Sequence, residues 1–247
     1  MSASERRQSV RTGVVWTAVR ELLDAPGAFH EQQARIVDIG GGTGGFAVPL
    51  AELGHHVRVI DPSPDALAAL DRRARESGVA GRVTGQQGDL GDLPGLVEAG
   101  SVDLVLCHGV LEVVDDPAAA LAAIAGVLRP GGHLSLLVAQ RHAAVVARAM
   151  AGHFQAARDL LDAGTPSGHA GRGGHRFTRE ELEPLLSAAG LGTSSVQAVR
   201  VFADLVPGSL LDLEPGATAA LVALEQAVAT RPEYFPLATQ LHVVARA

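Results

Sequence analysis

The chain has 247 residues, of which 47% are hydrophobic and only 3% aromatic, and its formal net charge at pH 7 is −7. This length and apolar content exclude a disordered chain and are sufficient for the core of one large α/β domain, filled mainly by leucine, valine and alanine. The negative net charge excludes a surface coated in positive potential, although it leaves room for a local basic patch.

The first predicted element is a helix over residues 7–23, where apolar residues repeat at helical spacing. The residues before it lack the apolar core of a signal peptide, and no uncharged apolar run is long enough to span a membrane. We therefore expect a soluble, cytoplasmic protein. The single cysteine, Cys107, excludes an internal disulfide and does not indicate a metal site.

The next hundred residues alternate between strand and helix signals. Strands are predicted at 35–39, 57–60, 82–86, 102–107 and 133–138. Helices are predicted between them at 45–53, 64–77 and 117–128. Pro49 lies deep in the first of these helices, so we expect that helix to start late or kink. Such alternation predicts a parallel sheet with helices on both faces.

The pattern changes after residue 138. It predicts a helix at 140–161, a Gly- and His-rich loop at 162–177, a helix at 178–189, a strand at 194–202, a helix at 217–229 and a strand at 239–245. We find no internal repeat and no interdomain linker. The expectation is a single domain over 1–247 with a mostly parallel, seven-stranded sheet and a lid-like insertion at about 140–179. The 162–177 loop is read either as surface disorder or as a substrate lid.

The stretch "DIGGGTGG", residues 38–45, carries Gly40-x-Gly42-x-x-Gly45, and Asp61 follows Gly40 by 21 positions. This spacing is typical of sites that bind adenosine cofactors, either NAD or another. The glycines let a ligand approach the backbone after the first strand, and the following helix offers free N–H groups. A carboxylate at the end of the second strand can accept hydrogen bonds from both ribose hydroxyls.

Three further features separate the candidate cofactors. Asp38 suits a ligand with a cationic amino group and would repel a pyrophosphate. Asp89, at the end of the third strand, can accept a hydrogen bond from an adenine amine. The "LRPGG" turn, residues 128–132, lies between a helix and the fifth strand.

Together these motifs resemble the Rossmann-like class I S-adenosylmethionine (SAM)-dependent methyltransferases. Further stretches, "LCHGVLEVVDDPAAALAAIAGVLRPGGHLSLL", "QRH", "MAGHF", "VRVFADL", "ALEQAVATRPEY" and "LHVVARA", are similar to the bacterial tRNA 5-carboxymethoxyuridine methyltransferase family. That family esterifies the carboxylate of a modified wobble uridine. Val113 stands where many small-molecule methyltransferases carry a histidine, so that subgroup fits less well.

The resemblance implies SAM as the cofactor and assigns residues to it. The predicted cofactor-binding residues are Arg11, Asp38, Gly40, Gly41, Gly42, Asp61, Pro62, Asp89, Leu90 and His108. The predicted substrate residues are Gln140, His142, Arg200 and Tyr234. Four of them also have a structural reading: Arg11 as a solvated helix residue, His108 and Tyr234 as core residues, and Arg200 as the partner of an internal acid such as Asp204.

The expected acceptor is an anion, either tRNA or a small carboxylic acid. A carboxylate is already ionised at pH 7, so its methylation needs no general base, and we predict no catalytic residue and no metal. Residues 140–179 contain six arginines against two aspartates, which predicts a basic patch for an anionic partner. A SAM-binding protein without catalysis is the non-enzyme alternative.

Overall fold

The computed structural model describes residues 3–25, 33–162, 174–213 and 216–247. A seven-stranded sheet runs through the molecule in the order β3-β2-β1-β4-β5-β7-β6. The first five strands are β1 (Arg35–Ile39), β2 (His56–Asp61), β3 (Val83–Gln87), β4 (Val102–His108) and β5 (Leu128–Ala139). They pair in parallel, whereas β7 (Gln240–Arg246) is antiparallel to both β5 and β6 (Gly192–Val199). The predicted Rossmann-like, mostly parallel sheet is confirmed.

This topology brings distant segments to one edge of the sheet. The parallel strands and β6 end at that edge, and β7 begins there, since Gln240 lies opposite both Ala139 and Val199. We call it the carboxyl edge. In open α/β sheets, ligands bind beyond this edge, so the glycine loop after β1 and the residues after β5 and β6 all lie where a site is expected.

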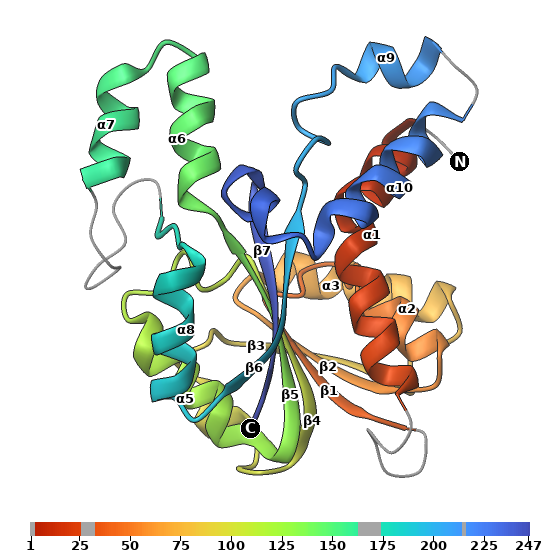
Figure 1. Cartoon of the computed structure of the whole chain (residues 1–247). Helices are drawn as coiled ribbons and strands as arrows, with labels where there is room; N and C mark the ends of the chain where they lie inside the picture. Colours follow the sequence, from red (N-terminus) through yellow and green to blue (C-terminus); the bar gives the residue numbers. More distant parts are fainter. Residues whose placement is uncertain (1–2, 26–32, 163–173, 214–215) are drawn as a thin grey trace.

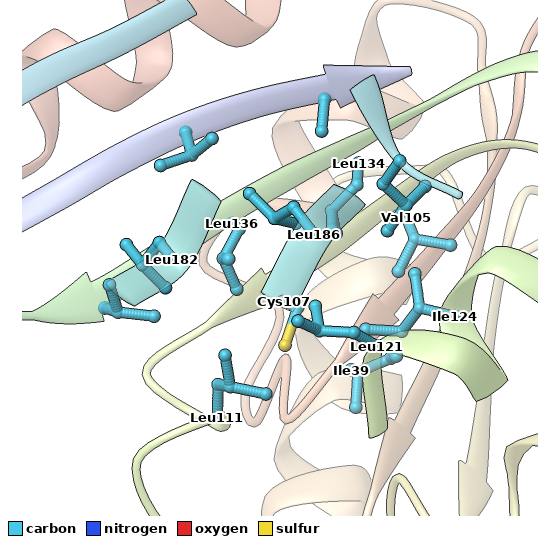
Figure 2. Packing of buried hydrophobic residues seen from close by; sticks show 14 of the residues in the cluster. Ile39, Val105, Cys107, Leu111, Leu121, Ile124, Leu134, Leu136, Leu182 and Leu186 are labelled. Atoms are coloured by element: carbon cyan, nitrogen blue, oxygen red, sulfur yellow. The ribbon is translucent and has the colours of Figure 1, made fainter. Parts of the chain in front are cut away.

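Helices cover both faces of the sheet (Figure 1). One face packs against α4 (Leu93–Leu96), α5 (Pro117–Val127) and α8 (Arg179–Ala188), and the other packs against α1 (Ala3–Asp24), α2 (Ala47–Glu52), α3 (Pro64–Glu76) and α10 (Ala217–Ala229). Figure 2 shows leucines of α5 and α8 meeting Val105, Leu134 and Leu136 of the sheet. Each fully buried leucine there contributes about 1.5–3 kcal/mol to stability.

Several helix ends follow directly from the local sequence. Ser63 caps α3 by accepting a hydrogen bond from the backbone N–H of Ala66, and Pro64 occupies the first turn. Helix α2 starts late, at Ala47, which leaves Pro49 within its first turn, where a missing N–H costs little.

The prediction of one continuous helix over 140–161 was wrong. The segment forms two helices, α6 (Arg141–Met150) and α7 (Phe154–Asp162), because Gly152 adopts a φ of +79° and ends the first. The two lie side by side and project beyond the carboxyl edge (Figure 1). Of the segment predicted as lid-like, residues 163–173 lie outside the described part of the chain.

Other differences are smaller. Strand β5 starts at Leu128 instead of residue 133, because Leu128 pairs with Val102 across a register shift that takes in the "LRPGG" turn. The short elements α9 (Gly208–Leu213) and η2 (Pro232–Leu237) were not predicted. None of the helices within the described ranges is both long and apolar enough to cross a membrane.

Candidate functional site

The glycine loop follows β1 at the carboxyl edge. Gly40 and Gly42 have φ values of +67° and +55°, which L side chains rarely adopt. The backbone N–H of Gly40 donates to the Ile60 carbonyl at 2.8 Å and holds the loop against the end of β2. A Cβ on Gly41 would collide with the Asp38 carboxylate, so the loop leaves no room there for a side chain.

Asp61 ends β2 and supports the same loop from below. Its Oδ2 accepts from the N–H of Gly42 at 2.9 Å, and its Oδ1 accepts from the N–H of Ser63 at 2.9 Å. A carboxylate offers about four lone pairs, so each oxygen keeps one for a ligand hydroxyl.

A cavity of about 860 Å³ opens beside these residues. Five of the predicted cofactor residues line it: Gly40, Asp61, Pro62, Asp89 and Leu90. The prediction missed the far wall, which is formed by the loop after β4 and the start of α5. The residues of that wall are Val110, Val113, Val114, Asp115, Asp116, Ala119, Ala120 and Ala123. Only their position after a strand that ends at the carboxyl edge could have indicated them.

Asp89 is exposed at the opposite rim of the cavity. Its Oδ1 accepts from the N–H of Gly91 at 2.7 Å, which fixes the turn after β3. The remaining lone pairs of the carboxylate are available to a donor such as an amine.

Asp38 lies beneath the glycine loop and is only 3% exposed. Its Oδ2 has no hydrogen-bond partner among the residues that the structure describes. Burial, and secondly the negative charge of Asp61, raise the pKa of Asp38 to about 7. A buried carboxylate without a partner is costly, and a ligand cation held at the loop would relieve that cost.

His108, at the end of β4, is not among the residues that line this cavity. It belongs to a chain of polar contacts across four strands. His108 Nε2 lies 2.9 Å from Ser135 Oγ, Ser135 Oγ lies 2.7 Å from His242 Nε2, and His242 Nδ1 lies 3.0 Å from Gln197 Oε1. Burial lowers the pKa of His108 to about 4, so its imidazole is neutral at pH 7.

The hydrogen-bond partners determine which nitrogen and oxygen atoms carry protons in this series of contacts. Gln197 Oε1 can only accept, so His242 donates from Nδ1 and accepts the Ser135 hydroxyl at Nε2. Ser135 then accepts from His108 Nε2–H. His108 Nδ1 is therefore an unprotonated acceptor, and it has no partner within the described ranges.

The predicted substrate residues lie near the carboxyl edge, and each contacts other residues of the protein there. Gln140 is 2% exposed and caps α6, since its Oε1 accepts from the N–H of Ala143 at 2.8 Å. Its Nε2 lies 3.0 Å from Nδ1 of the exposed His142. Tyr234, in η2, is half-buried and packs edge-on against Phe202 with ring centroids 6.1 Å apart. The side chain of Arg11 lies outside the described residues, although its backbone belongs to α1.

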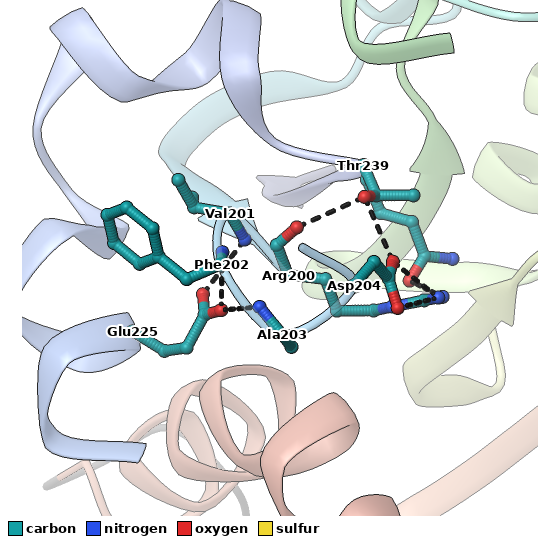
Figure 3. A network of polar contacts seen from close by, with 8 residues as sticks. Arg200, Val201, Phe202, Ala203, Asp204, Glu225 and Thr239 are labelled. Atoms are coloured by element: carbon teal, nitrogen blue, oxygen red, sulfur yellow. Dashed lines mark hydrogen bonds and ion pairs between the residues drawn. The ribbon is translucent and has the colours of Figure 1, made fainter. Parts of the chain in front are cut away.

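Arg200 does not lie within a strand, so the prediction of a strand through residue 202 was wrong. Strand β6 ends at Val199, and Arg200 adopts a φ of +60°. Its guanidinium donates to Asp204 at 2.8 Å, and Thr239 bridges the Arg200 carbonyl and the Asp204 carboxylate (Figure 3). Arg200 thus has the internal acidic partner that the sequence offered as an alternative.

The turn after Arg200 is held by a carboxylate that the sequence did not single out. Glu225 of α10 is 1% exposed. It accepts from the N–H groups of Val201, Phe202 and Ala203 at 2.7–2.9 Å (Figure 3). Its partners precede it by more than twenty residues, so no local pattern could have indicated the contact.

The predicted basic patch is partly neutralised. Arg141 pairs with Glu181 at 2.7 Å, Arg179 with Glu183 at 2.7 Å, and Arg158 with Asp162 at 3.8 Å. Two of these acids come from α8, beyond the segment whose charge was counted. Arg148 and Arg176 form no ion pair with any residue that the structure describes. Among the described residues, no group of three or more His, Cys, Asp or Glu side chains could hold a metal ion.

Comparisons with known proteins agree with this geometry. Residues 37–136, which span β1 to most of β5, match a family described as "Methyltransferase domain". The tRNA 5-carboxymethoxyuridine methyltransferase of Escherichia coli (strain K12) is 30% identical over 96% of this chain and 88% of its own length. A ubiquinone biosynthesis O-methyltransferase of Xanthomonas axonopodis pv. citri (strain 306) is 39% identical over 53% of this chain and 54% of its own. The S-adenosylmethionine-dependent methyltransferase from Mesorhizobium loti has the same fold, with a TM-score of 0.58 and 22% identity over 95% of this chain and 98% of that chain.

Proposed function

The chain belongs to the class I SAM-dependent methyltransferases, and from this premise we propose that it methylates a carboxylate, that of a 5-carboxymethoxyuridine in tRNA. The extent of the similarity carries this proposal. The tRNA methyltransferase of Escherichia coli matches 96% of this chain, so the similarity extends into the segments after β5 where we propose that the acceptor binds. The ubiquinone methyltransferase matches only 53%.

On the cofactor side, the residues present fit SAM. Asp38 Oδ2, which has no hydrogen-bond partner among the described residues, suits a cationic amino group, and Gly40 lines the cavity of about 860 Å³ beside the loop. We propose that Asp61 accepts hydrogen bonds from the ribose hydroxyls, that Asp89 accepts from the adenine amine, and that Arg11 binds the cofactor carboxylate. The other proposed contacts are Gly40, Gly41, Gly42, Pro62, Leu90 and His108.

Methylation of a carboxylate requires that the acceptor and the methyl donor are aligned, and it requires no proton transfer. When bound, SAM supplies a methyl group whose carbon–sulfur bond breaks as a carboxylate oxygen bonds the carbon, leaving the electron pair on sulfur. The acceptor carboxylate is ionised at pH 7, with a pKa near 4, so no base is needed. The chain's own task is to hold the acceptor in line and keep water out.

On the acceptor side, we propose Gln140, His142, Arg200 and Tyr234. Gln140 and Arg200 act as positioning residues, because one caps α6 and the other holds Asp204. Tyr234 supports the turn that carries Phe202. His142 is exposed at the start of α6, where it can reach a large substrate.

A small carboxylic acid is the second candidate acceptor. The supporting observation is a cavity of about 450 Å³ between α6 and residues 201–205, which has the size of a small-molecule site. A single modified base and a small acid both fit such a volume, so the acceptor has to be identified by experiment.

The test is incubation with methyl-labelled SAM and either total tRNA or a library of small carboxylic acids. We expect label in tRNA that is released by mild alkali, because methyl esters hydrolyse there and methylated bases do not. Label on small acids alone would favour the second candidate. Alkali-stable label, or no label on either substrate, would contradict carboxylate methylation.

A further inference from the structure

The cavity of about 450 Å³ beside α6 has apolar walls and a charged end. We call it the arginine cavity. Its apolar walls are formed by Ala143, Ala144, Val146, Ala147, Met150, Ala151, Val201, Phe202, Leu205 and Leu237. Its polar residues are Arg148, His153, Arg176, Asp204 and Thr239. Apolar lining with a few convergent polar groups is typical of sites that bind small organic groups.

The charge balance of the arginine cavity favours an anion. Asp204 is the carboxylate among its lining residues, and its oxygen lies 2.6 Å from the Arg200 guanidinium. Because Arg200 compensates that negative charge, the lining residues retain the positive charges of Arg148 and Arg176, and Glu112 is the carboxylate that acts on Arg176 from outside the lining. Neither of these two arginines forms an ion pair within the described ranges.

Backbone contacts at and beside Arg176 position it in the wall of the arginine cavity. Its carbonyl accepts from Arg141 at 3.0 Å, and the next residue, Phe177, forms a β-bridge with Gln140. Its buried Nε–H has no hydrogen-bond partner among the described residues. Leaving such a donor unsatisfied is costly, and a bound anion would satisfy it. Burial, and secondly the charge of Arg148, lower the pKa of Arg176, whereas Glu112 acts in the opposite direction.

We propose that the arginine cavity binds the acceptor, a carboxylate carried on an apolar or planar body, and that Arg176 and Arg148 bind the carboxylate. This rests on the proposed carboxylate methylation and replaces Arg200 as the residue that contacts the acceptor. The planar guanidinium fork matches a carboxylate, and the alanine, valine and phenylalanine walls match a ring.

The location is consistent with transfer from the cofactor site. Thr239 in the cavity wall accepts from the Gln140 N–H at 3.0 Å, so the arginine cavity lies at the carboxyl edge. His175, which precedes Arg176, donates its N–H to the Glu112 carbonyl at 2.7 Å, and its Nε2 lies 3.0 Å from the Val114 carbonyl. Val114 lines the cavity of about 860 Å³, so the residue before Arg176 contacts the wall of that cavity.

The test compares Arg176→Gln with Arg75→Gln. Arg75 is an exposed arginine of α3 whose partner is Asp71; it lies outside residues 140–179 and does not line the arginine cavity. With total tRNA as the acceptor, losing a charge-assisted contact should raise the KM of Arg176→Gln for tRNA by about ten- to a hundredfold. The dissociation constant for SAM, measured by calorimetry, should stay unchanged. Arg75→Gln should change neither quantity.

Three further measurements distinguish loss of a substrate contact from a purely structural effect. Arg148→Gln should show the same selective loss, and Arg176→Lys should recover only part of it because lysine lacks the fork. Binding of alkali-treated tRNA that carries the free carboxylate should weaken in Arg176→Gln, independently of turnover. If Arg176→Gln and Arg148→Gln both keep the wild-type KM and the wild-type affinity for tRNA, the proposal is overturned. Absence of alkali-labile label with the wild-type protein would instead overturn the carboxylate methylation on which it rests.

Discussion

At the scale of single residues, two carboxyl groups under the glycine loop have different surroundings. Asp61 accepts two backbone hydrogen bonds, whereas Asp38 Oδ2 has no partner among the described residues. Burial, and then Asp61, raise the pKa of Asp38 to about 7. The free protein therefore carries a partly protonated Asp38 near neutral pH, and a cationic ligand requires the ionised form.

This difference predicts a pH-dependent affinity for SAM. As the pH falls below 7, binding has to displace a proton from Asp38, so the dissociation constant should rise by up to about tenfold per pH unit. Calorimetry from pH 5.5 to 7.5, in buffers with different heats of ionisation, measures both the affinity and the released proton. Asp38→Asn should bind weakly, with little change over this range.

The variant Asp61→Ala distinguishes the role of Asp61 in SAM binding from that of Asp38. It should weaken SAM binding by about 1.5–3 kcal/mol, because it loses contacts between a charged group and the ribose. It should also move the pH midpoint downward, since the negative charge that helps to raise the pKa of Asp38 is gone. A pH profile that is identical in wild-type and Asp38→Asn would refute the role given to Asp38.

At the scale of elements, the turn after β6 depends on a helix that follows it in the chain. Arg200 leaves the strand with a φ of +60°, and the next three N–H groups converge on Glu225 of α10. The same turn carries Phe202 and Asp204 into the wall of the arginine cavity. The shape of that cavity is therefore coupled to the packing of α10.

We expect Glu225→Gln to lower the free energy of unfolding by about 2–3 kcal/mol, because the amide loses the charge and presents N–H groups to buried N–H donors. Urea denaturation measures the change. Glu233→Gln, at an exposed glutamate of η2, is the matched control and should stay within about 0.5 kcal/mol of wild-type. Equal stability of the two variants would mean that Glu225 does not hold the turn.

At the scale of the whole molecule, the contacts from His108 through Ser135 and His242 to Gln197 link β4, β5, β7 and β6. Burial, and secondly the electrostatic effect of His108, lower the pKa of His242 to about 3. Both imidazoles are thus neutral in the folded protein well below the ordinary value of 6.5. A chain of neutral donors and acceptors ties the parallel part of the sheet to its antiparallel end.

Lowering the pH should decrease the free energy of unfolding through His242. Between about pH 6.5 and 4, an unfolded histidine takes up a proton that the folded His242 does not bind, so stability is lost as the pH falls. His242→Gln removes this contribution. The difference in unfolding free energy between wild-type and variant should change by about 1.4 kcal/mol per pH unit in that window. The raised pKa of Asp38 has the opposite sign but is common to both proteins.

The measurement is urea unfolding of both proteins at pH 6.5, 5.5 and 4.5, compared as a difference at each pH. A difference that stays constant with pH would show that His242 gains a proton as readily in the folded protein as in the unfolded chain.

The sequence alone was sufficient to predict much of the fold and which loops share the carboxyl edge. Strand β1 was predicted with its observed bounds, and Gly40, Asp61 and Asp89 line one cavity at that edge. These features depend on short-range patterns: apolar runs, a cap at Ser63, and glycines where φ is positive. In a parallel sheet, such patterns also determine which loops share an edge.

Only the tertiary structure showed the surroundings of the residues that we propose for the acceptor. Arg200 looked like an unpaired charge in an apolar strand, yet the chain turns after Val199 and places Asp204 on its guanidinium. The role that we propose for Arg176 depends on α6 and residues 201–205, which line the same cavity. The order β5-β7-β6 brings these segments together although they are far apart in sequence. Burial and charge compensation depend on such distant neighbours, and a local pattern carries no information about them.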